Sequence, residues 1–520
     1  MQFKFSKFAT ALLASGIISL PITASANDSS ELEELRGLVQ ELSQQVKVLA
    51  RKGEINEEAA AADKKATPVV KAGTSGFSFG SADGKNEIKF RGVLQADHRH
   101  FSDGANDVRN RSATRAGSLD ANGFHDAEDT SLLRRVRPTI EGKVAGKYGF
   151  RFTPEFAGGS ASAVDAYVDA NLSPAFKIRA GKQKSIVGLE RLQGGGDIKF
   201  VERSYVTNAI LPNRDLGVTV SGDLFNNTLN YGVGIVNGVN DGGNISTGTE
   251  YNGEREYTAR LFATPFKDSD TALAGLGFGI GGTWTNYTGE RNLDFTGTSA
   301  ADATRNGLPS YVSDGQQTFF RYNSASLADG KRIRFTPQAS YYNGPFGLIT
   351  EYARVNQDVS LLAGTTTNTA TVISPNTNKK LSHDAWQVAA SYLITGEDAS
   401  FRGVKPKQDF DLDKGGWGAW ELVARYSEIN LDDDTFRNKA GTSYSTNTYA
   451  NLSESAKSAK SWTAGVNWYL NSNAKIALNY SHTSFDGGAG VGITAVNAAG
   501  TNIRDRESEN ALLARFQVAF

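Results

Sequence analysis

The sequence contains no cysteine, and after residue 26 it contains no long apolar run. The absence of cysteine excludes a disulfide framework and a thiolate metal site. The absence of a later run of roughly 18 apolar residues excludes a transmembrane helix beyond the start of the chain. Neither sign of charge is in excess, because 55 Lys and Arg stand against 56 Asp and Glu, a net charge of −1. This balance gives no support for nucleic-acid binding, which usually shows a basic excess.

Residues 1–26 have the pattern of a secretory signal peptide. Lys4 and Lys7 provide a positive start, an apolar run follows over 8–22, and Ala24-Ser25-Ala26 is a small-residue cleavage site. The run is short for a membrane anchor, which needs about 20 residues. We therefore expect residues 1–26 to be removed on export. The exported chain is then either soluble in the periplasm or crosses the outer membrane as a β-barrel.

Residues 27–52 are predicted to form a short periplasmic α-helical coiled coil. Apolar residues alternate there at spacings of three and four, as in an a/d seam: Leu32, Leu35, Val39, Leu42, Val46 and Leu49. The seam covers fewer than three heptads, so an isolated helix would be marginal and needs partner chains. Val at a with Leu at d leans toward two strands, which a trimeric barrel could override. The alternative is a solvated amphipathic helix. Residues 53–85 are interpreted as a flexible linker.

From residue 86 to 520 apolar and polar residues alternate, segment after segment. In the last segment Leu512, Phe516 and Phe520 fall on one face and Arg515 and Gln517 on the other. Segments of about ten alternating residues are the signature of a transmembrane β-barrel. The sequence therefore predicts an all-β fold, a transmembrane antiparallel β-barrel of about 16 strands. A soluble β-sandwich is the competing fold, but it does not explain short turns that alternate with long polar loops.

The predicted strands are even in number, as closure with both ends in the periplasm requires. They lie near 86–98, 131–144, 147–156, 163–172, 175–184, 215–222, 227–235, 254–266, 275–287, 332–342, 346–355, 384–394, 417–428, 461–470, 475–484 and 508–520.

The polar face of each strand is expected to line the lumen, with a modest excess of basic residues. Arg134-Arg135-Val136-Arg137 is the densest basic segment, and alternation directs Arg135 and Arg137 inward. Rings of Arg and Lys favour anions. The alternative is that these arginines pair with lumen carboxylates and only stiffen the wall.

The connection 185–214 is long, begins with apolar residues and contains three consecutive glycines. Such a loop could fold inward and narrow the pore. Gly277, Gly279 and Gly281 fall on the lumen face of one predicted strand, and glycine in a strand often marks close approach of another backbone. The alternative is that strands of this kind are simply rich in glycine.

At these residues the chain resembles the phosphate- and polyphosphate-selective porin O and P family of Gram-negative outer membranes. The resemblance covers about 76–520 and is carried by the order of several short motifs. These are Arg91–Asp97, Leu133–Pro138, Gly181–Lys184 followed by Val187–Arg191, Phe200–Ser204, Arg260–Phe266, Tyr392–Glu397 and Gly418–Leu422.

The resemblance implies a homotrimer of 16-stranded barrels with inward loops, a basic constriction and a preference for anions. Arg134 and Arg135 match a lumen arginine pair of the family, and Arg191 stands where phosphate-selective members carry a lysine. Val93 stands where those members have an arginine, and the loop 288–331 lacks their closely spaced arginines. Together with lumen parity this gives eight candidate pore-lining residues: Arg91, Arg134, Arg135, Arg137, Arg179, Lys184, Arg191 and Arg260.

The expected function is passive diffusion of small solutes through the outer membrane, with inorganic anions such as phosphate preferred. A general low-selectivity porin and a coiled-coil-tethered structural protein are the alternatives. An enzyme is not expected, because none of the five histidines stands beside a recognisable serine motif. No cofactor or metal motif is present. The expected partners are the lipid bilayer, lipopolysaccharide and two further copies of the chain.

Overall fold

The computed structural model describes residues 29–74, 76–102, 108–109, 124–125, 127–245, 253–289, 306–362, 377–440, 448–488 and 505–520. The chain divides into two compact units, Met1–Thr67 and Pro68–Phe520.

The described part of the first unit is one long helix, α1 (Ser29–Ala66). The side chains of Leu35, Leu42 and Leu49, which form part of the predicted seam, are more than half exposed on this single chain. The helix continues through residues 53–66, where the sequence predicted a linker. Ala, Glu and Lys, which are strong helix formers, dominate that stretch. The helix therefore tolerates Gly53, which costs about 1 kcal/mol relative to Ala. No helix in the described residues is long and apolar enough to cross a membrane.

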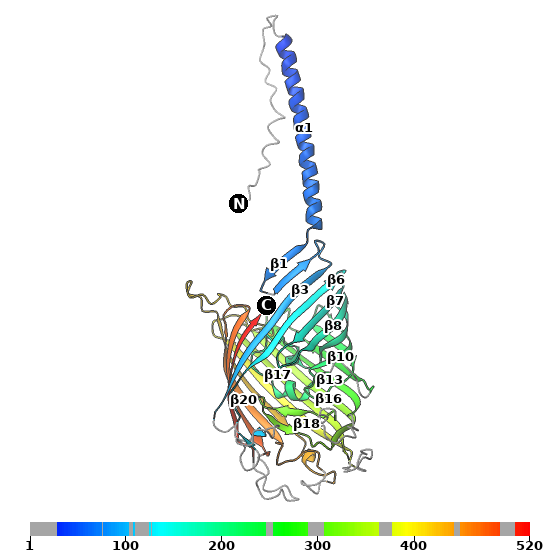
Figure 1. The fold of residues 1–520 in the computed structure, drawn as a ribbon, viewed down its shortest axis with the longest axis vertical. Helices are drawn as coiled ribbons and strands as arrows, with labels where there is room; N and C mark the ends of the chain where they lie inside the picture. The colour runs from blue at the N-terminus through cyan, green and yellow to red at the C-terminus, as the bar shows by residue number, and fades with distance from the viewer. Residues whose placement is uncertain are drawn as a thin grey trace. The chain divides into compact units, whose positions relative to one another are not determined.

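The second unit is a closed antiparallel β-barrel of 16 strands (Figure 1). The first eight barrel strands are β3 (Glu87–Ser102), β6 (Thr130–Val144), β7 (Tyr148–Glu155), β8 (Ser162–Ser173), β9 (Phe176–Lys184), β10 (Arg214–Leu224), β11 (Leu229–Val236) and β12 (Glu256–Ala263). The others are β13 (Leu276–Thr288), β16 (Ser326–Asn343), β17 (Phe346–Leu361), β18 (Lys379–Leu393), β19 (Ala419–Asn430), β20 (Ser458–Tyr469), β21 (Ala474–Asp486) and β22 (Glu509–Ala519).

Closure occurs between the last strand and the first. β22 pairs with β3 from Asn510↔Ser102 to Ala519↔Val93. Phe520 completes the seam, since its N–H donates to Gly92 O (3.0 Å) and its C=O accepts from Gly92 N (2.9 Å). Because the cylinder has no free edge, its strands satisfy their backbone groups among themselves, as a bilayer requires.

A hairpin extends the sheet where β22 ends. β1 (Val69–Gly73) pairs with β2 (Gly76–Gly80), and β2 pairs with the start of β3 through Phe77↔Phe90 and Gly80↔Glu87. The sequence placed this segment in the linker. Phe77 and Phe79 alternate with small residues and fit the exposed edge of β3, so the hairpin forms only with that strand as its partner.

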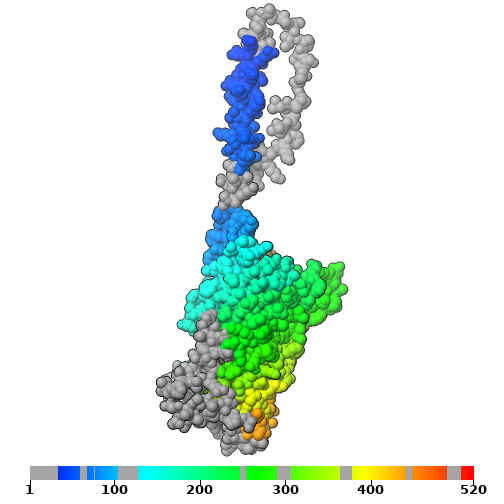
Figure 2. All heavy atoms as spheres, turned by 90° about the vertical axis from the view of Figure 1, so that its right-hand side faces the viewer, coloured from blue at the N-terminus to red at the C-terminus, as the bar shows by residue number. Residues whose placement is uncertain are grey.

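The predicted strands are confirmed, and their two faces differ as expected. On β22 Leu512 and Phe516 face outward, 39% and 50% exposed, whereas Leu513, Arg515 and Gln517 face inward and are buried. On the face seen in Figure 2, the segments coloured from cyan through green to yellow follow one another in chain order along the barrel. Alternation therefore presents an apolar band to lipid and a polar face to the lumen.

The connections differ in length at the two ends of the barrel. At one end, the turn end, most are short, such as Ala145–Lys147 and Pro174–Ala175. At the loop end they are long and carry β4 (Val108–Arg109), β5 (Phe124–His125), β14 (Ser310–Val312), β15 (Thr318–Arg321) and the 3-10 turn η4 (Asp433–Phe436). Residues 394–418 depart from the predicted asymmetry, because they form a long connection at the turn end, as do 264–275 with η2 (Ala272–Gly275).

Candidate functional site

The inner loop, residues 185–213 between β9 and β10, lies inside the barrel. It contains the helical turn α2 (Leu189–Leu192) and one π-helical turn, η1 (Val206–Ile210). Glu351 on β17 fixes the start of α2, because its carboxylate accepts from Leu189 N (2.6 Å) and Glu190 N (3.0 Å). These amides have no partner within the helix, so a side chain of the wall satisfies them.

Side chains of the wall also satisfy the carbonyl groups of the inner loop. A buried loop without sheet partners must find other hydrogen bonds for its backbone. Six lumen side chains donate to it: Gln338 to Val187 O, Gln95 to Gly195 O, Gln517 to Gly196 O, Lys475 to Ile198 O, Asn467 to Lys199 O and Arg425 to Glu202 O, at 2.7 to 2.9 Å. The polar lumen face of the barrel thus holds the loop across the channel.

Glycine allows the loop to approach the wall. A Cβ added to Gly281 would lie 2.7 Å from Val187 O, so this strand glycine makes room for the loop, as the sequence suggested. A Cβ on Gly277 would instead meet the ring of Phe262 (2.6 Å), and a Cβ on Gly279 would meet the backbone oxygen of Leu261. Within the loop, a Cβ on Gly195 would lie 3.2 Å from Arg135 Cδ. The glycines therefore serve close packing.

The β14–β15 hairpin fills a second part of the lumen. Asp314 at its tip accepts from Arg425 (3.0 and 3.1 Å) and from the hydroxyls of Ser461, Thr463 and Ser481 (2.8 to 3.0 Å). Behind it, apolar side chains of both inner segments form a buried core against β17 to β20. This side of the barrel is closed by packing.

The opposite side, along β6 to β10, contains two large cavities. One, of about 580 Å³, opens toward the loop end, and the other, of about 520 Å³, toward the turn end. We call them the loop-end cavity and the turn-end cavity. Both are lined by Arg137 on β6 and Arg214 on β10, so the two cavities adjoin at these side chains.

Basic side chains outnumber acidic ones in both linings. The loop-end cavity has Arg134, Arg137, Lys182 and Arg214 with Glu155 as its acidic residue. The turn-end cavity has Arg91, Arg135, Arg137, Arg151, Lys177, Arg179, Lys184, Arg214 and Arg402, against Asp165, Asp169 and Asp197.

A β-bulge explains how two consecutive arginines both reach the lumen. The register of β3 with β6 shifts between Gln95↔Arg135 and Ala96↔Leu133, which leaves Arg134 without a partner residue. A bulge re-aims one side chain. Arg134 consequently bonds Glu202 of the inner loop through Nε (2.7 Å) and Nη2 (3.1 Å), while Arg135 also points inward. Strict alternation alone would have directed Arg134 to lipid.

Most of the lining cations are paired with a carboxylate. The pairs are Arg91–Glu141 (3.2 Å), Arg134–Glu202 (2.7 Å), Arg137–Glu155 (2.5 Å), Arg151–Glu141 (3.5 Å), Lys177–Asp223 (3.0 Å), Arg179–Asp169 (3.2 Å) and Arg214–Asp165 (2.9 Å). The alternative interpretation of the sequence, that lumen arginines pair with carboxylates, therefore holds for the six arginines among these cations.

Arg135 and Lys184 are different. Arg135 Nη1 donates to Gln95 Oε1 (2.5 Å), and Lys184 Nζ donates to the carbonyls of Gln193 (2.6 Å) and Leu192 (3.4 Å). In the described part of the chain no carboxylate oxygen lies within 4.0 Å of either cation. Arg135 is 4% exposed, and its Nε has no hydrogen-bond partner among the described groups. Neither charge is therefore neutralised by an ion pair.

Charges of the inner loop reinforce this bias. Burial, together with Arg214, Arg137 and Arg134, lowers the pKa of Arg203 to about 10 against the opposing effect of Glu190. Arg203 therefore remains charged at neutral pH. Burial would raise the pKa of Glu202, but Arg134 and the other arginines near it lower that pKa far below its usual range. Glu202 is consequently ionised and neutralises Arg134.

Six of the eight predicted residues line the cavities, and two do not. Arg191 is buried, donates to Thr207 O within the inner loop and lines neither cavity. Arg260 bonds Gln338 and Asn230 of the wall and is also absent from both linings. Sequence reasoning missed Arg214, whose position at the start of β10, beside the loop, was the available signal.

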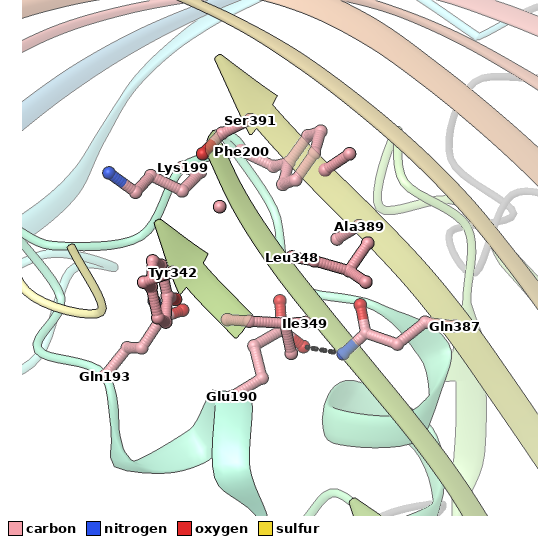
Figure 3. Close-up of a pocket in the computed structure, with 12 residues that line it drawn as sticks. Glu190, Gln193, Lys199, Phe200, Tyr342, Leu348, Ile349, Gln387, Ala389 and Ser391 are labelled. Atoms are coloured by element: carbon pink, nitrogen blue, oxygen red, sulfur yellow. Dashed lines mark hydrogen bonds between the residues drawn. The ribbon is translucent and has the colours of Figure 1, made fainter. Parts of the chain in front are cut away.

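A third cavity, of about 20 Å³, lies behind the inner loop between α2 and strands β17 and β18 (Figure 3). Gln387 donates there to Glu190 (3.2 Å), next to Leu348 and Ile349. A space of this size holds about one water molecule, so it belongs to the packing of the loop. No group of three or more His, Cys, Asp or Glu in the described ranges is arranged to hold a metal ion.

The comparison with protein families decides what kind of barrel this is. The model of the family described as phosphate-selective porin O and P matches residues 109–520. The chain belongs to this family. The barrel is accordingly that of an outer-membrane porin, and the resemblance seen in the sequence motifs is confirmed. A comparison with curated proteins found no match.

Solved structures of other porins are similar to this porin. The outer membrane channel DcaP of Acinetobacter baumannii is 11% identical with a TM-score of 0.47, over 84% of this chain and 97% of that chain. The anion-selective porin from Comamonas acidovorans is 13% identical with a TM-score of 0.45, over 84% and 100%. OmpT of Vibrio cholerae in its trimer form is 12% identical with a TM-score of 0.45, over 84% and 99%.

Proposed function

We propose that this porin is a passive channel of the Gram-negative outer membrane that passes anions in preference to cations, phosphate among them. The observation that carries the proposal is the pair of adjoining cavities along β6 to β10, in whose linings Arg and Lys outnumber Asp and Glu. A solute crosses from one cavity to the other past Arg137 and Arg214. No chemical step is needed, because binding must only be strong enough to select and weak enough to release.

The mature chain would begin after residue 26 and assemble as a homotrimer, each barrel with its own pore. OmpT of Vibrio cholerae has been solved in a trimer form, which supports this assembly. Lipid meets the apolar band, and lipopolysaccharide is the expected partner of basic residues in the outer loops.

A weakly selective porin is the second candidate, and the seven ion pairs of the lining favour it. A cation beside its own carboxylate contributes little net field at the distance of a passing ion. In that case selectivity rests on Arg135, Lys184 and Arg203, whose charges are not balanced by an ion pair of their own.

The test is the reversal potential of the purified trimer in a planar bilayer under a KCl gradient. We expect a reversal potential whose sign shows that chloride is more permeant than potassium. We also expect the chloride current to fall when phosphate is added. A reversal potential of the opposite sign, which shows that potassium is more permeant than chloride, would contradict the anion preference. A chloride current indifferent to phosphate would remove phosphate from the proposal and leave the anion channel.

A further inference from the structure

The turn-end cavity is not lined by charge alone. Val93 on β3, Ile186 and Leu192 of the inner loop and the ring of Tyr167 on β8 also line it. Val93, Ile186 and Leu192 are each only partly buried, so part of each apolar side chain meets the channel. A wall that served only hydrated inorganic ions would have no use for apolar surface, because such ions lose hydration beside it.

These apolar groups adjoin the cation that lacks a carboxylate partner. Lys184 Nζ lies 3.4 Å from the carbonyl oxygen of Leu192, and Ile186 follows Lys184 by two residues. Ile186 is held in place by β11, because a Cβ on Gly232 would lie 3.0 Å from Ile186 Cδ1. An available positive charge and a fixed apolar surface therefore stand side by side.

Val93 on β3 adds apolar surface to the lining of the turn-end cavity. Its partner across the ladder is Arg137, one of the two residues shared by both cavities. The chain thus has an uncharged, branched side chain at a place where another cation would suit phosphate.

We propose that the turn-end cavity selects organic anions that combine an anionic head group with an aromatic or branched apolar body. Arg135 and Lys184 receive the head group, and Val93, Ile186 and Leu192 contact the body. The proposal rests on the anion channel proposed above and names its substrate class. Burial of a phenyl group against these side chains would favour such an anion over one with the same head and a methyl group by about tenfold.

The experiment compares benzenesulfonate with methanesulfonate as blockers of chloride current through the full trimer in a planar bilayer. Both anions keep their charge at every working pH, so neither proton uptake nor a neutral form confuses the result. We expect benzenesulfonate to halve the current at about one tenth of the concentration that methanesulfonate requires.

Two variants remove the apolar contact without changing charge. Val93→Thr keeps the shape of the side chain, and Leu192→Asn keeps nearly its size. Each is expected to reduce the preference for benzenesulfonate to about threefold while the reversal potential in KCl stays the same. Leu412→Asn is the matched control, because Leu412 is 78% exposed in the segment 394–418 and lines neither cavity. If Leu192→Asn disturbs the inner loop, Val93→Thr on the barrel wall still tests whether the apolar contact causes the preference for benzenesulfonate.

The outcomes separate the two proposals. A chloride-preferring channel that both sulfonates block equally overturns the present inference and leaves the anion channel intact. A preference for benzenesulfonate that survives in both variants also overturns it, because the contact then lies elsewhere. A channel that prefers potassium contradicts the anion channel itself.

Discussion

At the scale of single residues, the position of a charge matters less than whether it is already neutralised. Arg91 and Arg137 line the pore, but each has a carboxylate within 3.2 Å. Lys184 has only carbonyl acceptors and stands beside the inner loop. An uncompensated charge in a narrow, partly desolvated channel acts on a passing ion with less screening than one at the mouth.

Lys184→Gln and Arg91→Gln test this difference, since each removes one positive charge. Lys184→Gln is expected to lower the chloride-to-potassium permeability ratio about threefold, because the lost charge was uncompensated and little screened. Arg91→Gln is expected to change the ratio little, because Arg91 is exposed at the turn end and pairs with Glu141. Reversal potentials measure both. Equal changes would show that the number of charges, and not their pairing, sets selectivity.

The sequence predicted these lining residues from one rule only, the alternation of side chains between the lipid face and the lumen face of a strand, which we call strand parity. Parity correctly directs Arg91, Arg135, Arg137 and Arg179 to the lumen, because side chains alternate strictly in a strand. It cannot tell that Arg260 is covered by neighbouring wall residues. The bulge at Arg134 was also beyond parity, because one extra residue shifts the face and leaves no pattern in the sequence.

At the scale of elements, the strands and the inward fold of the loop 185–213 were predictable, and the contacts of the connections were not. A strand that faces lipid on one side and water on the other must alternate, so its sequence records its position. The inner loop is held by six side chains from distant strands, and no local pattern reports such contacts. The same holds for residues 394–418, which the sequence left as an unassigned connection between two predicted strands. That segment reaches the tip of the inner loop, where Gly403 N donates to Asp197 Oδ1 (3.0 Å).

Asp197 therefore joins two elements, and two substitutions separate its roles. Asp197→Ala removes the acceptor for Gly403, a loss of about 1 kcal/mol that should loosen the tip of the loop and increase open-channel noise. Asp197→Asn keeps an oxygen acceptor but removes the negative charge, so noise should remain that of the parent while anion preference rises. Single-channel recordings measure both quantities. If Asp197→Ala is as quiet as the parent, the turn-end segment does not steady the loop.

At the scale of the whole molecule, the barrel is much wider than its pore. A cylinder of this strand number has room for an aqueous channel, but the inner loop and the β14–β15 hairpin fill one side of it with an apolar core. The route is confined to the side of β6 to β10, where the cavities lie. The wide barrel thus supplies a wall on which loops are mounted, and the loops narrow the route to the side where the basic side chains of β6 to β10 lie.

The helical unit raises the question of assembly, because α1 exposes a row of apolar side chains that a single chain leaves uncovered. Copies of the same helix are the expected cover, since the row has the spacing of a coiled-coil seam. The chain has no cysteine, so one introduced cysteine can report the contact. Leu42→Cys at a seam position should yield disulfide-linked pairs of chains on mild oxidation, because seam side chains of neighbouring helices come within disulfide reach. Val48→Cys, exposed but outside the seam, should yield few. A folded trimer in which Leu42→Cys stays uncrosslinked on a non-reducing gel would show that α1 meets something other than its own copies.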